Sequence, residues 1–355
     1  MPTKIGNYTL RLDHSPSIVG FAAVVGKKEG EGPLARYFDT ISEDTTFGEQ
    51  SWEKAESRMQ KDAVNKALSK CALHAGDLDF IFAGDLLNQC IGTHYGLREL
   101  GVQFIGLYGA CSTMAESLAM ASLFVDSGIA RKCAALTSSH FCSAERQFRF
   151  PLEYGGQRAT TTQWTVTGSG CAIVGESENA PYVKAVTIGT IEDMGVTDMN
   201  NMGAAMVPAA HKTLTRFFED TCTSPKNYDL IITGDLGFIG NQMLFDLLKQ
   251  DGYDTEKKLA DCGMLIYDRE KQDVHAGGSG CGCSASVMCS YIMDGIQKGK
   301  LNEVIFIATG ALMSPTSVQQ GESIPAIAHL VHLSSIKNNT DKNSVNSLNK
   351  KKTSK

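Results

Sequence analysis

The sequence predicts a layered α/β fold with two pseudo-twofold related halves, because one pattern of residues occurs twice along the chain. Residues 78–86 read LDFIFAGDL and residues 228–236 read YDLIITGDL, at an offset of 150 positions. Residues 109–138 and 280–309 align in the same way, at an offset of 171 positions. Each copy predicts a β-α-β-α-β unit in which helices join parallel strands. Such a sheet needs helices on its faces, which gives alternating layers of helix and sheet.

A long amphipathic helix precedes the first copy. Ser51 is a residue type that caps helices well, and we expect it to begin a helix over 52–68. The predicted strand over 78–84 ends at Gly-Asp, and the helix that follows it stops at Gly101. The buried face of the first helix follows the 3.6-residue period and consists of Ala55, Met59, Ala63, Val64 and Leu68.

The rest of the first copy centres on a helix of small side chains. The short apolar run at 104–108 is the middle strand of the unit, and 112–125 predicts a helix that stops at Gly128. A further apolar strand is expected over 133–136. The second copy repeats this order and has its own helix stop at Gly299.

We expect three parts in the chain: an N-terminal half over 1–179, a C-terminal half over 180–333 and a tail over 334–355. The tail holds six lysines and one aspartate, a net charge of +5, and is otherwise almost all Ser, Asn and Thr. Such a composition cannot bury a core, so we predict a disordered tail. The whole chain has a net charge of −6, which leaves −11 for residues 1–333. An acidic body argues against a nucleic-acid partner.

The composition also indicates the compartment. No apolar run approaches the ~20 residues of a transmembrane helix, and residues 1–16 lack the apolar core of a signal peptide. Eleven cysteines, an odd number spread along the chain, indicate free thiols in a reducing, cytosol-like compartment. Cys281, Cys283 and Cys289 lack the spacing of a zinc site, so we expect no bound metal and interpret them as small core residues.

Cys111 is the residue that most strongly suggests chemistry. It lies between the predicted strand over 104–108 and the helix over 112–125. A sulfur at a helix N-terminus is placed where free N–H groups and the helix dipole favour a thiolate. The alternative is that Cys111 packs as a small buried apolar residue, as most free cysteines do. We interpret Cys111 as a pocket-lining, vestigial nucleophile.

The repeated unit and its cysteine resemble the thiolase superfamily, which includes the condensing enzymes of fatty-acid synthesis. In that fold a nucleophilic cysteine begins a buried helix of the first half, and Ala110-Cys111-Ser112 matches this element. Residues 168–174 resemble the glycine turn into a late strand of the first half, and 277–286 resemble the glycine-rich catalytic loop of the second half. The resemblance implies a layered α-β-α-β-α fold and a homodimer formed through the first half.

Further segments resemble one family of sporulation proteins more closely, the stage V sporulation protein AD family. The resemblance covers nearly the whole chain except the tail. It implies binding of dipicolinic acid (pyridine-2,6-dicarboxylate), its uptake with calcium into the developing spore, and action beside membrane proteins at the inner spore membrane. The matching segments are 84–89, 138–140, 144–149, 153–157, 277–281 and 323–325.

The catalytic partners that such a fold normally supplies are missing from the positions where the resemblance places them. Residues 231–245 contain no histidine, and Asp235 stands after the second-half strand. The glycine-rich loop offers Ser279 or Cys281, depending on the register, and neither is histidine or asparagine. Without an imidazole, little acceleration of acyl transfer is expected. We therefore predict a catalytically degenerate protein. The alternatives are an active acyltransferase that uses Cys111, for which His275 is the one candidate base, and a purely structural subunit of a membrane complex.

A dicarboxylate ligand calls for planar, bidentate donors beside an aromatic face. Arg146, Arg149 and Arg158 lie in or near one loop, and His140 precedes them as a further donor. The aromatic residues Phe148, Phe150 and Tyr154 are interleaved with these arginines. The alternative is that the arginines form surface ion pairs, worth ~0–1 kcal/mol each.

Three carboxylates complete the predicted ligand site. Asp85 and Asp235 follow equivalent strands, where ligands bind in parallel sheets, and either can instead cap the next helix. Glu116 lies in the apolar helix after Cys111, where Thr113-x-x-Glu116 is also a capping-box pattern. If calcium enters with the ligand, these three side chains are the possible oxygen donors.

Overall fold

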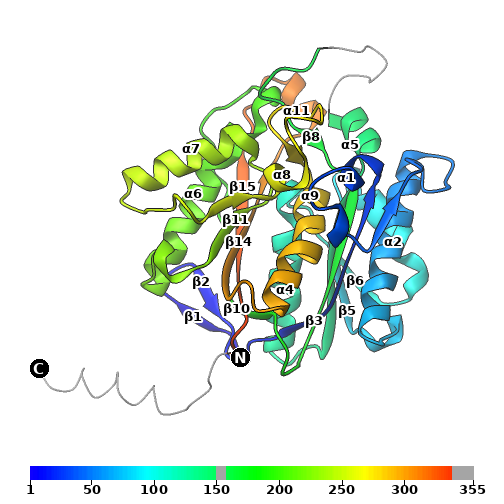
Figure 1. The fold of residues 1–355 in the computed structure, drawn as a ribbon, viewed down its shortest axis with the longest axis vertical. Coiled ribbons are helices and arrows are strands. Elements are labelled where there is room, and N and C mark those ends of the chain that lie inside the picture. The colour runs from blue at the N-terminus through cyan, green and yellow to red at the C-terminus, as the bar shows by residue number, and fades with distance from the viewer. Residues whose placement is uncertain (149–156, 338–355) are drawn as a thin grey trace, which may run out of the picture.

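The two sequence copies form the two halves of a five-layered structure, seen in a computed structural model that describes residues 1–148 and 157–337 (Figure 1). Helix, sheet, helix, sheet and helix follow one another across the molecule. Each sheet packs one face on a central pair of helices and the other face on an outer pair. The layered fold with related halves that the sequence predicts is therefore confirmed.

The first half has five strands in one sheet. Its order from the edge inward is β6 (Gln103–Gly106), β5 (Phe80–Gly84), β7 (Lys132–Ser139), β9 (Gly168–Gly175) and β3 (Ser17–Gly26). β6, β5 and β7 are parallel, whereas β9 is antiparallel to both of its neighbours.

The second half repeats this order. Its strands are β12 (Leu259–Asp261), β11 (Leu230–Thr233), β14 (Glu303–Ala311), β15 (Ala326–Ser334) and β10 (Tyr182–Thr187). β12, β11 and β14 are parallel, and β15 is antiparallel to β14 and β10. The innermost strands β3 and β10 touch at their ends, so the two halves are related by a pseudo-twofold axis.

Two central helices lie between the sheets and four outer helices cover them (Figure 1). The central pair is α4 (Thr113–Asp126) and α9 (Cys281–Val287), and α9 continues through the π-helical turn η9 (Met288–Ile292) into α10 (Met293–Gln297). The outer helices are α2 (Trp52–Lys70) and α3 (Ile91–Leu97) on one side and α6 (Met202–Thr221) and α7 (Gly237–Gln250) on the other. The shorter elements are β1 (Thr3–Ile5), β2 (Thr9–Arg11), α1 (Lys27–Gly30), η1 (Ala35–Tyr37), β4 (Thr40–Ser42), η5 (Ala110–Ser112), α5 (Phe141–Phe148), β8 (Trp164–Thr165), α8 (Cys262–Ile266), β13 (Gly278–Ser279) and α11 (Pro315–Gln319).

The predicted helix boundaries are observed. The Ser51 hydroxyl accepts a hydrogen bond from the backbone N–H of Lys54 at 3.4 Å, which begins α2 as expected. The glycines predicted to stop helices have left-handed backbones, with φ of 65° at Gly101, 75° at Gly128 and 68° at Gly299. Among the described residues, no helix is both long and apolar enough to cross a membrane.

Small residues let the central layer close tightly. A Cβ atom on Gly170 of β9 would lie 2.2 Å from the carbonyl oxygen of Ala285 in α9. A Cβ atom on Gly310 of β14 would lie 2.1 Å from the carbonyl oxygen of Gly109. These contacts pack α9 of the second half on β9 of the first half, and the turn before Cys111 on β14 of the second half. The division at residue 179/180 stays a prediction. Of the predicted tail over 334–355, Ser334 is the last residue of β15 and was wrongly included, whereas 338–355 lie outside the described residues.

Candidate functional site

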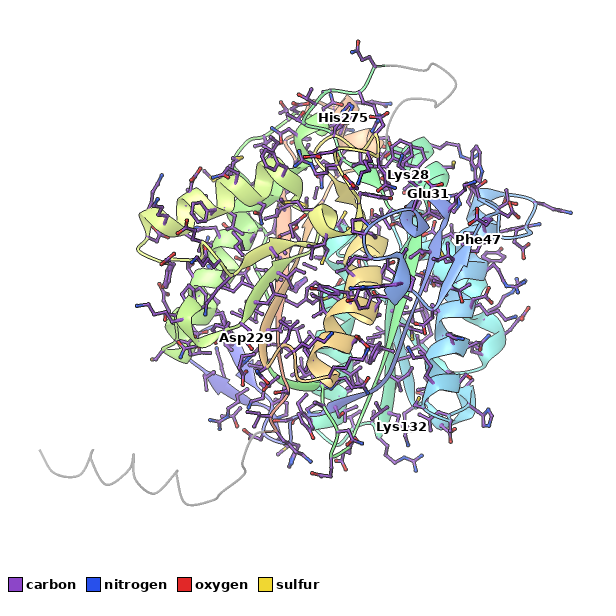
Figure 2. All side chains as sticks on the ribbon, in the orientation of Figure 1. Lys28, Glu31, Phe47, Lys132, Asp229 and His275 are labelled. Atoms are coloured by element: carbon purple, nitrogen blue, oxygen red, sulfur yellow. The ribbon has the colours of Figure 1, made fainter. Side chains whose placement is uncertain are left out.

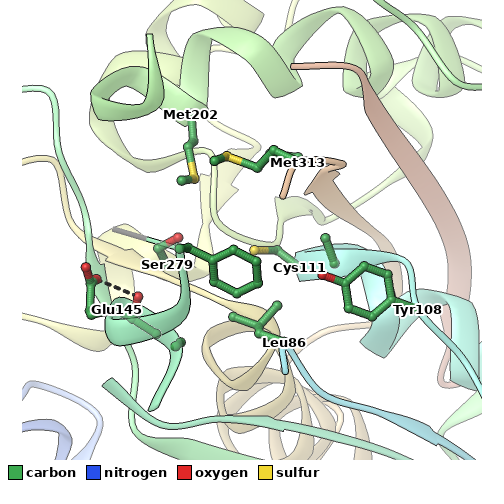
Figure 3. A pocket seen from close by; sticks show the side chains of 12 residues that line it. Leu86, Tyr108, Cys111, Glu145, Met202, Ser279 and Met313 are labelled. Atoms are coloured by element: carbon green, nitrogen blue, oxygen red, sulfur yellow. Dashed lines mark hydrogen bonds between the residues drawn. The ribbon is translucent and has the colours of Figure 1, made fainter. Parts of the chain in front are cut away.

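A small cavity lies between the halves, where β5, β6 and β14 end, and Cys111 points into it (Figure 3). Its volume is about 40 Å³, room for a few water molecules only. Met202 and Met313 of the second half lie on the side opposite Leu86. The lining is mostly apolar and comprises Leu86, Tyr108, Ala110, Cys111, Ala144, Glu145, Phe148, Thr165, Met202, Ser279, Ala311 and Met313.

Cys111 lies in the tight turn η5 directly before α4. The preceding residue, Ala110, has a left-handed backbone with φ of 49°, which turns the chain sharply into the helix. Only 7% of Cys111 is exposed. Burial, and then the nearby Asp235 carboxyl, raise the pKa of the Cys111 thiol well above its ordinary value. The prediction that this position favours a thiolate is therefore wrong. The cost of desolvating the charged sulfur outweighs the stabilisation that the helix N-terminus gives it.

Asp235 is the residue that faces Cys111 from the second half. Its carboxyl is fully buried and hydrogen bonds to the Cys111 thiol. The same carboxyl accepts hydrogen bonds from the backbone N–H of Gly280 at 2.9 Å, the hydroxyl of Ser279 at 3.2 Å and the hydroxyl of Thr309 at 3.3 Å. Burial raises the pKa of Asp235 from 3.8 to about 7 despite these bonds. Near neutral pH the site therefore holds a thiol and a carboxyl that is close to half protonated.

No imidazole completes the site. All eight histidines of the chain lie in the described segments, and none of them lines the cavity. His275 lies at the surface of the molecule (Figure 2), in a turn with φ of 49°. Its Nδ1 lies 2.7 Å from the carbonyl oxygen of Ala159, and its Nε2 lies 3.2 Å from Asp273.

The structure shows which residue of the glycine-rich loop faces the cavity. Ser279 lines the cavity and donates its hydroxyl to Asp235. The thiol of Cys281 lies 2.8 Å from the carbonyl oxygen of Ser138 and packs in the same small apolar cluster as Cys111. Neither residue can take up and return a proton as an imidazole does.

Asp85 caps the chain after β5 instead of lining the cavity. Its carboxyl accepts hydrogen bonds from the backbone N–H groups of Leu87 at 2.8 Å and Thr93 at 2.7 Å. Behind it lies a second buried carboxyl, Glu56, which sequence reasoning missed. Burial, and then the Asp85 carboxyl, raise the pKa of Glu56. Glu56 accepts hydrogen bonds from Ser138 and Ser143, each at 2.8 Å, and thereby attaches α2 to the start of α5. The signal in the sequence was a charged residue on the apolar face of the first helix.

Glu116 and His140 lie close to the cavity without lining it. Glu116 forms no cap at the start of α4, and its Oε2 packs against Gly109 with no hydrogen-bond partner in the described structure. His140 is buried, and burial lowers the pKa of its ring. One ring nitrogen of His140 lies 2.8 Å from the carbonyl oxygen of Thr45, and the other accepts the N–H of Cys142. His140 therefore orders two loops.

The two predicted arginines that the structure describes, Arg146 and Arg158, do not line the cavity. Arg146 pairs with Glu53 of α2, outside the site. Arg158 pairs with Asp273 at 2.6 Å, and its guanidinium lies 4.9 Å from the ring centre of Trp164. Trp164 precedes the lining residue Thr165 in β8, so the two side chains point to opposite faces and Arg158 lies across β8 from the cavity. Arg149, Phe150 and Tyr154 lie outside the described residues.

The residues do not fit a resident metal. Within 1–148 and 157–337, no group of three or more His, Cys, Asp or Glu side chains converges on a point that could hold an ion. Asp85, Glu116 and Asp235 are therefore not brought together as calcium ligands. Asp261, the last residue of β12, is likewise occupied, because it accepts hydrogen bonds from the backbone N–H groups of Leu236, Gly237 and Met264.

The comparison with known sequences decides the family. A model of the family described as "Stage V sporulation protein AD (SpoVAD)" matches residues 6–334. The chain belongs to this family. A curated relative, "Stage V sporulation protein AD" of Bacillus subtilis (strain 168), is 45% identical over 324 residues, which cover 91% of this chain and 96% of the relative.

Solved structures show the same fold at low sequence identity. The 3-oxoacyl-[acyl-carrier-protein] synthase III of Aquifex aeolicus VF5 matches 90% of this chain and all of its own, with a TM-score of 0.57 and 14% identity. A point variant of OleA from Xanthomonas campestris matches 91% of this chain and 99% of its own, with a TM-score of 0.59 and 13% identity. The SpoVAD family member described here therefore has a thiolase-like fold.

Proposed function

We propose that this protein binds dipicolinate for uptake into the developing spore and that its thiolase-like site transfers no acyl group. Dipicolinate is the ligand that the family resemblance implies. The observation that supports a binding role without chemistry is Asp235, which faces the Cys111 thiol where a condensing enzyme needs an imidazole.

Acyl transfer at this site would have to proceed without a resting thiolate and without an imidazole. A thiolate must attack, a base must take up a proton, and hydrogen-bond donors must stabilise the oxyanion. The Cys111 thiol is held protonated by burial, and an ionised Asp235 repels both a thiolate and an oxyanion. The loss of one oxyanion donor alone costs ~10²–10³ in rate.

The same groups suit a ligand that carries carboxylates. When Asp235 is protonated, its O–H can donate a hydrogen bond to a ligand carboxylate, and no negative charge opposes the ligand. Tyr108 and Phe148 supply aromatic surface at the cavity. A volume of about 40 Å³ does not hold a pyridine ring with two carboxylates, so we propose that Met202 and Met313 move on binding. Methionine side chains are unbranched and adapt readily to such changes.

Isothermal titration calorimetry with dipicolinate, with and without calcium, tests the proposal. We expect saturable binding that weakens as the pH rises above about 7, by up to ~tenfold per pH unit, because Asp235 ionises. Met313→Trp should abolish binding by filling the cavity, whereas Met243→Trp, at a partly exposed position of α7, should leave it unchanged. Absence of heat under both calcium conditions would refute the binding role.

One observation favours the alternative, an active acyltransferase. The cavity is apolar and contains a cysteine, as a site for an acyl chain would. If this alternative holds, an acyl-thioester forms on Cys111 and is lost in Cys111→Ser. Intact-protein mass spectrometry after incubation with acyl-coenzyme A separates the two functions.

We also propose that the protein is a homodimer that acts beside membrane proteins of the spore. β6 is the edge strand of the first half, and among the described strands it pairs with β5 alone. Ile105 and Tyr108 expose apolar surface at this edge. An edge strand with exposed apolar side chains is stabilised when a second strand adds to it.

A further inference from the structure

A second, larger cavity lies far along the central helix from Cys111. It has a volume of about 660 Å³, within the range of ligand pockets. The stretch formed by α9, η9 and α10 begins at Cys281, beside the first cavity, and lines this groove from Ser290 to Gln297. We call this second cavity the basic groove. Its lining comprises Val19, Gly20, Phe21, Arg36, Tyr37, Lys70, Ser290, Asp294, Gln297, Lys298 and Lys300.

The basic groove carries an excess of positive charge in an otherwise acidic body. Four lining residues are cations and only Asp294 is an anion. Lys298 pairs with Asp294 at 2.7 Å, and Lys70 pairs with Asp39 at 2.9 Å. Arg36 and Lys300 form no ion pair with a carboxylate in the described segments, so at least two positive charges remain uncompensated. This surplus distinguishes the basic groove from the cavity at Cys111, which no described cation lines.

Aromatic side chains hold two of the cations in place. The guanidinium of Arg36 lies 4.9 Å from the ring centre of Tyr37 and donates to its hydroxyl at 3.0 Å. The ammonium of Lys70 lies 4.7 Å from the ring centre of Phe21. A cation held over an aromatic ring has lost part of its freedom before a ligand arrives, which lowers the entropic cost of binding.

Two local irregularities shape the walls. The β3–β9 register shifts between Ile18 and Gly20, so Val19 forms a bulge at the groove. A Cβ atom on Gly20 would lie 2.7 Å from the sulfur of Cys71, so this glycine lets the end of α2 approach β3 and places Lys70 at the groove.

The opposite wall is the π-helical turn η9, which carries Ser290. Tyr291 of this turn meets Tyr37 edge to face, with ring centres 5.0 Å apart, and so connects the two walls. Bulges and π-turns are over-represented at functional sites.

We propose that the basic groove is a binding site for a small dianion, in which Arg36 and Lys300 supply the uncompensated charges. Lys70 and Lys298 also stand at helix ends, where cations offset the helix dipole without any ligand. Arg36 lies in η1, away from the ends of α2 and α10, so these helix dipoles do not account for its charge. A dicarboxylate and a phosphate share the chemistry that this site recognises. The inference goes beyond the proposed function, because it concerns a second site.

Calorimetric titration with two probes, inorganic phosphate and dipicolinate, tests the inference. In Arg36→Gln/Lys300→Gln we expect the affinity for at least one probe to fall by about tenfold or more. The matched control is Lys66→Gln/Lys226→Gln, which removes two positive charges at exposed positions that do not line the groove. This control should bind as the unchanged protein does.

Three results would overturn the inference: no saturable binding of either probe, equal loss in both double variants, or no loss in Arg36→Gln/Lys300→Gln. Met313→Trp separates the two sites. If Met313→Trp abolishes dipicolinate binding and Arg36→Gln/Lys300→Gln leaves it intact, dipicolinate binds in the Cys111 cavity. If phosphate also fails to bind, the proposed function stands and the groove site falls. If Arg36→Gln/Lys300→Gln weakens the binding of a probe and Met313→Trp does not, that probe binds in the basic groove.

Discussion

The carboxyl of Asp235 makes the stability of the protein depend on pH, and Asp235→Asn should remove that dependence. The pKa of this buried group rises from 3.8 to about 7 on folding. The folded protein therefore holds a proton that the unfolded chain has lost between these two pH values, so stability falls as the pH rises through this window. At about 1.4 kcal/mol for each pKa unit, the loss amounts to ~4 kcal/mol at pH 8.

Asparagine can replace the protonated form with little other change. Its carbonyl oxygen can accept the N–H of Gly280, and its amide can donate to the hydroxyl of Thr309, where Asp235 now accepts both. One lost acceptor costs ~1 kcal/mol, so the net gain at pH 8 should be ~3 kcal/mol. Near pH 4 the variant and the unchanged protein should be about equally stable.

Urea unfolding followed by circular dichroism between pH 4 and pH 8 measures this difference. The exposed Asp254→Asn variant removes the same formal charge from the surface and should follow the unchanged protein throughout. Parallel stability curves for Asp235→Asn and the unchanged protein would refute the raised pKa and, with it, the pH dependence expected for dipicolinate binding.

Three further outcomes follow from the structure. Iodoacetamide near pH 7 should alkylate the exposed Cys222 at least ~10 times faster than the buried Cys111, and peptide mass spectrometry that finds equal rates would contradict the raised thiol pKa. Gly170→Ala should lower the free energy of unfolding by ~3 kcal/mol, because its Cβ would lie 2.2 Å from the carbonyl oxygen of Ala285, and unchanged urea unfolding would refute this packing. If the proposed homodimer forms through β6, Ile105→Asp should halve the mass found by light scattering, and a dimer that survives would place the interface elsewhere.

The fold was predictable because its signals are local and repeated. The Gly-Asp strand ends before Leu86 and Leu236, the helix stop at Gly128 and the cap at Ser51 each depend on neighbours in the sequence. The pairing of β3 with β10 and the direct contact of α9 with β9 were not predictable, because they depend on distant backbones. Among the described residues, the small side chains of 281–287 gave the only hint of that close approach.

The site was predictable in part. Cys111 and Asp235 meet as the thiolase resemblance implies, and the structure selects Ser279 over Cys281 as the loop residue that bonds to Asp235. The protonated state of the thiol was missed, because it depends on burial by residues of the other half. The arginine prediction failed to anticipate the partners of Arg146 and Arg158, since Glu53 and Asp273 lie about a hundred residues away in the sequence.

The central claim is that the thiolase-like site has lost the proton chemistry that acyl transfer requires. Intact-protein mass spectrometry after incubation with acyl-coenzyme A tests it most directly, with an active condensing enzyme as the positive control. We predict an unchanged mass for this protein, because Cys111 stays protonated beside Asp235. An added acyl mass that Cys111→Ser abolishes would contradict the account and establish a working enzyme.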